Sequence, residues 1–235
     1  MLKIDYSDLS STILRFLTKS NDNPTRVISM AASLGEDIIF GRRLPGSTLN
    51  SVELAQTFQT SRTPVREALA ILEKEGLVEQ YSRRRPRVAE LTITDIRELY
   101  GVRAAILALV ASEAARNATD EELIEMTKIA AVMSESAAIE NLDACYWLNV
   151  HFYERLTDIA RNITLKRILD TLVLRSLRLK RVALSIPARA QKSANEHVHL
   201  AEALNARNAE LASAIAHSNV LVAYSTIESK LAIPK

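Results

Sequence analysis

The feature that most constrains the fold is the helical periodicity of the chain after Thr92. Apolar residues recur there at helical intervals, and no alternating run typical of a strand interrupts them. Thr119 followed by Glu122 forms a capping-box pattern at the start of one such segment. Six helices are predicted, near 94–117, 120–139, 141–161, 163–185, 190–206 and 208–231. Helices of this length joined by short loops indicate an antiparallel helical bundle.

Composition agrees with a mainly helical chain and excludes several other classes. The 235 residues include only five glycines, which disfavours a β-sandwich or a dinucleotide-binding sheet because their turns consume glycine. The single cysteine, Cys145, excludes an internal disulfide framework and fits a reducing compartment. No signal peptide opens the chain and no apolar stretch is long enough for a membrane span. We therefore expect a cytoplasmic protein without a membrane partner.

The residues before Thr92 follow a different pattern. A first helix is predicted from Pro24 to Gly41, a second over about 51–59 and a third over about 61–75. The segment LVEQYSRRRPRVAEL that follows is predicted to form two short strands around a basic tip. Three helices and a two-stranded hairpin are typical of a winged helix-turn-helix. Residues 1–23 are either a short docked helix or a frayed terminus.

The start of the third helix has the side chains expected of a DNA contact. The segment SRTPVREAL, 61–69, holds two arginines, two hydroxyls and a proline. The proline lies in the first turn of the helix, where it is harmless because the N–H groups there have no intrahelical partner. The positive end of a helix dipole favours a phosphate, and arginine can form bidentate hydrogen bonds with guanine. DNA contacts are predicted for Ser61, Arg62, Thr63, Pro64 and Arg66.

A second concentration of positive charge lies in the hairpin. Its tip, YSRRRPR, has four arginines and no acid, and such a wing can lie on the phosphate backbone or in the minor groove. Because the net charge is only +2, local clusters of this kind must supply any attraction to DNA. Further DNA contacts are predicted for Arg42, Arg43, Arg83, Arg84 and Arg85. The alternative is that each arginine, taken alone, is an ordinary surface residue.

The motif LPG-x-x-LN-x-x-ELAQTFQTSRTPVREALAILEKEGLV, Leu44 to Val78, resembles the DNA-binding domain of the GntR family of bacterial transcriptional regulators. The helical remainder, with HFYERL at 151–156 and NEHVHLAEAL at 195–204, resembles the FadR subfamily, whose effector domain is called FCD, in its shorter, VanR-like form. The resemblance implies a homodimer that binds a palindromic operator and responds to a small metabolite. The wing of this family usually has a glycine at its tip, where this chain has Arg84-Arg85-Pro86.

The resemblance also implies positions for a metal site. Many FCD domains hold a divalent metal with an aspartate, a histidine four residues later and two further histidines. The corresponding residues here are Asn149, Tyr153, His197 and His217. An amide oxygen and a neutral tyrosine are poor ligands beside carboxylate and imidazole. The resemblance therefore predicts at most an incomplete site for zinc or nickel, at His197 and His217.

Polar residues within apolar stripes indicate a cavity in the helical domain. Asn149 and Tyr153 lie on the apolar stripe of their helix, and Arg175 lies on that of the next one. Buried polar groups need partners, and arginine suits a carboxylate. A small anionic effector is predicted to contact Arg103, Asn149, Tyr153, Arg175, His197 and His217. The alternative is that these groups satisfy one another or buried water.

Together these patterns predict a metabolite-responsive transcriptional regulator. It would bind a double-stranded DNA operator as a homodimer and act as a repressor that a small carboxylate releases. The predicted parts are an N-terminal extension (1–23), a winged helix-turn-helix DNA-binding domain (24–90) and an FCD effector-binding and dimerisation domain (91–235). One alternative is a helical enzyme or ligand-binding module, with or without metal, that uses His197 and His217, although no paired nucleophile supports an enzyme. Another is a module whose basic wing binds a membrane or RNA.

Overall fold

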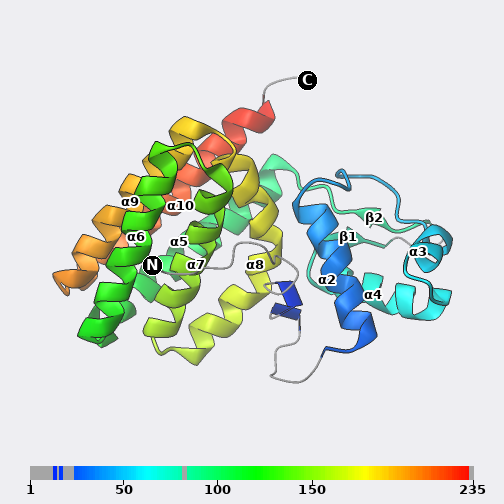
Figure 1. Ribbon diagram of the computed structural model, residues 1–235, viewed down its shortest axis with the longest axis horizontal. Helices are drawn as coiled ribbons and strands as arrows, with labels where there is room; N and C mark the ends of the chain where they lie inside the picture. The colour runs from blue at the N-terminus through cyan, green and yellow to red at the C-terminus, as the bar shows by residue number, and fades with distance from the viewer. Residues whose placement is uncertain (1–12, 15, 18–23, 81–83, 233–235) are drawn as a thin grey trace. The chain divides into compact units, whose positions relative to one another are not determined.

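The computed structural model describes residues 13–14, 16–17, 24–80 and 84–232 and is mainly α-helical (Figure 1). The chain divides into two compact units. The first comprises Met1–Glu90 with Asp170–Arg178, and the second comprises Leu91–Leu169 with Leu179–Lys235. Most of the predicted N-terminal extension lies outside the described residues, and its four described positions are helical.

The first unit contains the predicted three helices and hairpin, which confirms the winged helix-turn-helix. The helices are α2 (Arg26–Ile39), α3 (Ser51–Thr57) and α4 (Arg62–Lys74), and the strands are β1 (Val78–Glu79) and β2 (Arg87–Val88). The strands pair antiparallel, with Val78 opposite Val88. Helix α4 packs against both α2 and α3, and Leu34, Leu54 and Leu69 are buried between them. Burial of these side chains is the main stabilising term for such a small unit.

The turn between α3 and α4 sets where α4 begins. Gln59 has a positive φ of 48°, so the chain reverses sharply after the last turn of α3. The Arg26 side chain donates from Nη2 to the carbonyl oxygens of Phe58 and Gln59, at 3.1 and 3.0 Å. These carbonyls lie at the end of α3 and would otherwise lack an intrahelical partner. Arg26 therefore ties α2 to the turn that positions α4.

The remaining helices are α5 (Ile93–Asn117), α6 (Asp120–Ala138), α7 (Leu142–Ile159), α8 (Ile163–Leu184), α9 (Pro187–Asn205) and α10 (Ala209–Ala232), which confirms the predicted six. Helix α10 runs along α5, while α6 packs against both α7 and α9 (Figure 1). The middle of α8, Asp170–Arg178, groups with the first unit. Helix α9 begins at Pro187, earlier than predicted, because proline fits the first turn of a helix.

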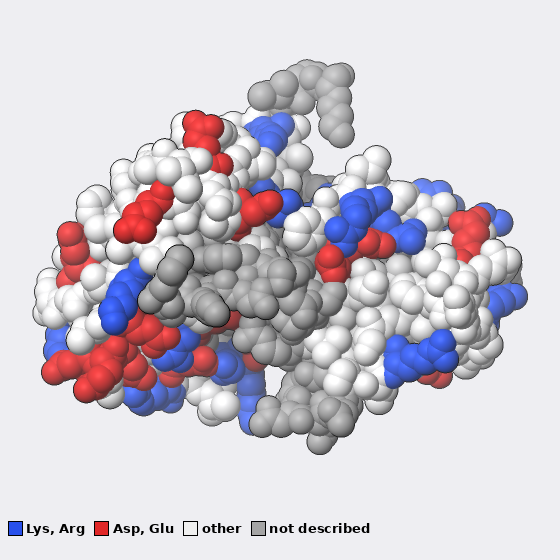
Figure 2. All heavy atoms as spheres, viewed as in Figure 1, with Lys and Arg blue, Asp and Glu red and all other residues white. Residues whose placement is uncertain are grey.

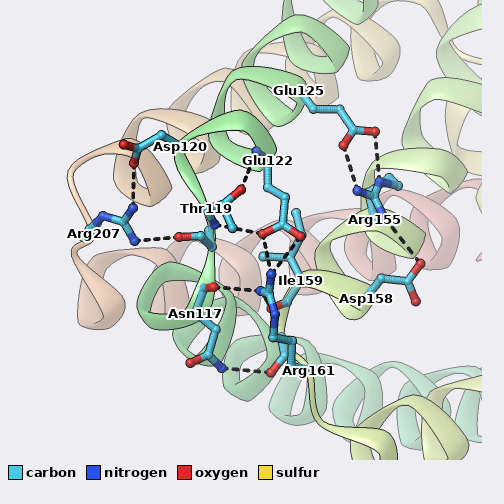
Figure 3. A network of polar contacts seen from close by, with 12 residues as sticks. Asn117, Thr119, Asp120, Glu122, Glu125, Arg155, Asp158, Ile159, Arg161 and Arg207 are labelled. Carbon is cyan, nitrogen blue, oxygen red and sulfur yellow. Dashed lines mark hydrogen bonds and ion pairs between the residues drawn. The ribbon is translucent and has the colours of Figure 1, made fainter.

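Polar contacts close one end of the second unit (Figure 3). Thr119 and Glu122 form the predicted capping box, in which Glu122 Oε2 accepts from Thr119 N at 2.8 Å. The same carboxylate receives Arg161 Nη2 at 2.9 Å, and Arg161 Nη1 donates to Asn117 O at 2.7 Å. Arg207 pairs with Asp120 at 2.8 Å. Because Arg161 and Arg207 occupy turns between helices, these contacts join three helix connections.

Candidate functional site

The start of α4 presents polar side chains to solvent. Ser61 takes the N-cap position, but its hydroxyl makes no capping hydrogen bond. Arg62, Thr63 and Arg66 are exposed, whereas Val65 is completely buried. The helix thus buries one face and leaves the hydroxyls and guanidinium groups of its first turns outward.

The two guanidinium groups of α4 are also unpaired. Within the described residues, neither Arg62 nor Arg66 has an ion pair or a side-chain hydrogen bond, and the first turn of α4 has no acidic residue. The backbone N–H groups at a helix start carry partial positive charge, which adds to that of the arginines. This end of α4 can therefore donate hydrogen bonds to phosphate oxygens or base edges without first breaking an internal contact.

Arg42 and Arg43 differ from the arginines of α4. Arg42 pairs with Glu36 and with Asp37 at 2.7 Å each, and Arg43 Nε lies 3.4 Å from Asp37. The hydrogen bonds that Arg42 donates to Asp37 and Glu36 raise the pKa of Arg42 above its ordinary value. The DNA contacts predicted for Arg42 and Arg43 would therefore require a phosphate to displace these carboxylates. Both acids lie near the end of α2, just before the arginines in the sequence.

The wing is held at its base and carries exposed arginines. Leu49 N donates to Pro86 O at 2.7 Å, and Val88 N donates to Ser47 O at 2.9 Å. Arg84 and Arg85 are exposed, and the predicted contact Arg83 lies outside the described residues. On the face in view, basic and acidic side chains lie beside one another (Figure 2).

A cavity lies within the second unit, between α5, α7, α8, α9 and α10. Four predicted effector contacts line it: Arg103, Asn149, Tyr153 and His197. Six further polar residues also line it, beside four apolar ones: Tyr100, Lys180, Arg189, Ser193, Glu196 and Asn219. The space that water centres can occupy is about 30 Å³, which is room for roughly two water molecules. The cavity therefore suits a compact polar ligand or the head group of a larger one.

Two predicted effector contacts lie elsewhere. His217 is exposed on α10, whereas Asn219, two residues later, is buried and lines the cavity. Half a helical turn thus separates the predicted residue from the one that reaches the cavity. Arg175 belongs to the segment of α8 in the first unit, where its Nε donates to Glu75 O at 3.3 Å. Arg175 is partly buried, as its place on an apolar stripe suggested, but its neighbours belong to the first unit.

His197 and Asn149 form a defined pair in the cavity. His197 Nδ1 lies 2.7 Å from Ser193 O, and a carbonyl oxygen can only accept, so Nδ1 carries the proton. Nε2 is then an acceptor, and Asn149 Nδ2 donates to it at 3.3 Å. Burial lowers the pKa of His197 to about 4, so its ring is neutral at neutral pH. Asn149 Oδ1 is left without a partner.

The cavity contains more cationic than anionic groups. Arg189 pairs with Glu196 through Nη2 at 2.9 Å, but its Nε and Nη1 have no partner. The Arg103 guanidinium lies 5.3 Å from the Tyr100 ring centre. Burial and the nearby Arg103 lower the pKa of Lys180 well below its ordinary value. Glu196 is the one carboxylate among the described lining residues, so the cavity has an excess of positive charge.

The side chains of this cavity do not fit a divalent metal. A metal would need the lone pair of His197 Nε2, which instead accepts from Asn149 Nδ2. Within the described ranges, no group of three or more His, Cys, Asp or Glu residues could hold a metal ion. Because His217 is exposed, the structure does not bring the two histidines predicted for zinc or nickel to this cavity.

Comparison with known families decides the identity of both units. Residues 98–220 match the FCD domain, and residues 29–88 match the bacterial regulatory proteins of the gntR family. The chain belongs to the GntR family and carries an FCD domain. Both families and the relatives below are transcriptional regulators, so the enzyme alternative is rejected. Among the described residues, no helix has the length and apolar character needed to cross a bilayer.

Several named relatives share this family. The chain is 32% identical over 153 residues to the uncharacterized HTH-type transcriptional regulator YdhC of Bacillus subtilis, covering 63% of this chain and 67% of that protein. It is 30% identical over 163 residues to the gluconate operon transcriptional repressor of Bacillus licheniformis, covering 65% of each. It is also 30% identical over 142 residues to the transcriptional repressor RspR of Escherichia coli, covering 59% of this chain and 61% of that protein. The matched part thus spans about two thirds of these relatives or less.

Solved structures show the same fold. The E. coli protein McbR/YncC has a TM-score of 0.75 at 18% identity, over 89% of this chain and 100% of that one. A GntR-type putative regulator from Rhodococcus has a TM-score of 0.72 at 21% identity, over 90% and 100%. At these identities the likeness concerns the fold alone.

Proposed function

We propose that this GntR-family regulator binds a palindromic operator as a homodimer and that a small carboxylate in the FCD cavity releases it from DNA. The observation that carries the DNA part is the exposed start of α4, where Arg62 and Arg66 have no ion pair with any residue that the structure describes. In a dimer, two such helices would enter successive major grooves about 34 Å apart. The arginines would contact base edges, while the hydroxyls of Ser61 and Thr63 would contact phosphates or bases.

An exposed apolar stripe on α5 supports the homodimer. Val102 and Leu109 are 51% and 46% exposed, and Ala105 lies exposed between them. Residues spaced by three and four lie on one face of a helix. The stripe is small in the single chain, and covering it with a second copy would remove apolar surface from water. We propose that α5 contributes to the dimer contact.

The charge of the cavity supports an anionic effector. Arg103, Lys180 and Arg189 line it, with Glu196 as the described carboxylate. Arginine recognises carboxylates through planar, charge-assisted hydrogen bonds. The relative from B. licheniformis is named for a gluconate operon, and gluconate is a carboxylate. Such an effector changes operator affinity only if it binds the DNA-bound and free conformations unequally.

Titration of the purified chain against DNA from its own promoter region tests this function. Fluorescence anisotropy should show specific binding of two chains per site and a steep loss of affinity with rising salt, because phosphate contacts release counterions. Added carboxylates of increasing size should include one that lowers the affinity. Binding without sequence preference, or one chain per palindromic site at saturation, would contradict the proposal.

A further inference from the structure

The cavity of the second unit contains two hydrogen-bond donors and one acceptor that have no partner among the described residues. Arg189 is 7% exposed, and its Nε and Nη1 have no partner. Asn149 is also 7% exposed, and its Oδ1 has no partner. Buried polar groups are normally hydrogen-bonded, because leaving one unpaired costs the full desolvation penalty. A ligand that completes this cavity must therefore offer acceptors to Arg189 and a donor to Asn149.

The orientation of the Asn149 amide follows from its neighbours. His197 Nδ1 must donate to Ser193 O, so Nε2 can only accept. The amide nitrogen of Asn149 therefore faces Nε2, and the reversed amide would set two acceptors against each other. Consequently Asn149 Oδ1 is an acceptor without a donor among the described side chains, and a ligand can supply that donor.

The donor on the ligand can be named by charge. An ammonium group would enter a cavity lined by the guanidinium groups of Arg103 and Arg189, where like charges repel. A hydroxyl can donate to Asn149 Oδ1 without adding positive charge. The unpaired N–H groups of Arg189 call for an anion, and a carboxylate matches their geometry. Because the free space is small, the lining side chains must shift to admit a ligand, and a compact molecule that carries both groups requires the smallest shift.

We infer that the cavity binds a short hydroxycarboxylate without a metal ion. Arg189, assisted by Arg103 and Lys180, holds the carboxylate, and Asn149 Oδ1 accepts from the hydroxyl. The cationic side chains provide the positive charge that a bound metal would otherwise supply. This inference rests on the proposed carboxylate-responsive function and specifies its ligand class and chemistry.

Calorimetry with matched acids tests the inference on the full chain after treatment with EDTA. Lactate and propionate differ by one hydroxyl, as do 2-hydroxybutanoate and butanoate. The hydroxy acid of at least one pair should bind about tenfold or more tightly than its partner, because the acid without a hydroxyl leaves Asn149 Oδ1 unpaired. Alanine, with an ammonium at the same position as the lactate hydroxyl, should bind more weakly than lactate.

Two variants separate recognition from folding. Asn149→Leu keeps a similar volume but removes the acceptor, so the preference for the hydroxy acid should fall to about onefold to threefold while carboxylate binding persists. Thr157→Ala serves as the control, because Thr157 is a buried polar residue of the same helix whose hydroxyl donates to Tyr153 O at 2.7 Å, and it does not line the cavity. It should keep the preference. If Asn149→Leu does not fold, the comparison of acid pairs on the unaltered chain decides the matter.

Each outcome has a distinct meaning. Equal affinity for both members of each pair would overturn the hydroxyl inference and leave the carboxylate-responsive regulator standing. Binding that requires added zinc or nickel would overturn the metal-free part alone. If no acid of either pair binds, the inference of a short hydroxycarboxylate is overturned, whereas the operator titration with larger carboxylates still tests the proposed function separately.

Discussion

Arginines occupy two contrasting environments in this molecule. Arg62 and Arg66, at the start of α4, are exposed and form no ion pair among the described residues. Arg103 and Arg189, in the cavity of the second unit, are 5% and 7% exposed. An exposed guanidinium keeps its hydration until a ligand arrives, so its interactions are weakened by salt. A buried one has already lost water and needs a partner in the protein or in a ligand.

This difference predicts different consequences of mutation. Changes at the start of α4 should affect binding and leave folding unchanged, because water replaces whatever contact is lost. Changes in the cavity should affect stability as well as binding, because no water is at hand to replace a lost contact of a buried polar group. The following predictions test that distinction.

The largest expected effect is on stability, from Arg189→Ala. It would leave the Glu196 carboxylate, whose side chain is only 13% exposed, without its partner at 2.9 Å. Breaking a buried ion pair in this way costs about 3–5 kcal/mol. Urea unfolding should show this loss, and adding Glu196→Gln should recover much of it by removing the unpaired charge. A single variant as stable as the unaltered chain would show that the pair is not effectively buried.

Acidification should destabilise the cavity through His197. Its pKa is lowered to about 4 in the folded state, whereas an ordinary histidine has a pKa of about 6.5. As pH falls, the unfolded chain protonates His197 before the folded chain does. The stability that the neutral His197 contributes is therefore fully present above pH 6.5 and is lost as pH falls toward 4. The loss totals about 3 kcal/mol at the acidic end. Unfolding free energies measured over this range should depend less on pH in His197→Gln.

Removal of either arginine from α4 should weaken operator binding. Arg62→Ala and Arg66→Ala are each expected to lose about 1–3 kcal/mol of affinity if the arginine contacts bases. Their urea unfolding curves should coincide with that of the unaltered chain, because both side chains are exposed and unpaired. Arg116→Ala, an exposed arginine of α5, is the matched control for charge. Full affinity in both α4 variants would refute this assignment of the recognition surface.

The smallest effect is expected at Arg42. Glu36 and Asp37 already bind its guanidinium, so its removal takes little positive charge away from DNA. Operator affinity of Arg42→Ala should change by less than about 0.5 kcal/mol, and an exposed ion pair contributes similarly little to stability. An affinity loss as large as that of Arg62→Ala would mean that DNA displaces the two carboxylates.

The fold was largely predictable because its signals are local. The six helices after Thr92 begin and end within three residues of the predicted positions. Apolar spacing sets the extent of each helix, and caps such as Thr119 with Glu122 set its start. The start of α9 shows the limit of the periodic pattern, since Pro187 extended the helix before its apolar stripe began.

The cavity was only partly predictable. Asn149 and Tyr153 stood out because they interrupt an apolar stripe, and both line the cavity. Lys180 lies in a strongly basic run that reads as a solvated face, so its place in the lining was missed. Arg189 was missed as well, although Glu196 stands two helical turns later, a spacing that suits an ion pair on one helix face.

The sequence by itself determined the helices, the hairpin and the arginine-bearing start of α4, because these depend on neighbours within a few residues. Only the tertiary structure decided which arginine and lysine side chains line the cavity. It also decided that Asn219 rather than His217 reaches the cavity and that Asn149 donates a hydrogen bond to His197 Nε2. A helical period shows which face a residue occupies. It does not show which partner helix supplies the opposing charge or hydrogen bond, because that depends on packing between segments distant in the chain.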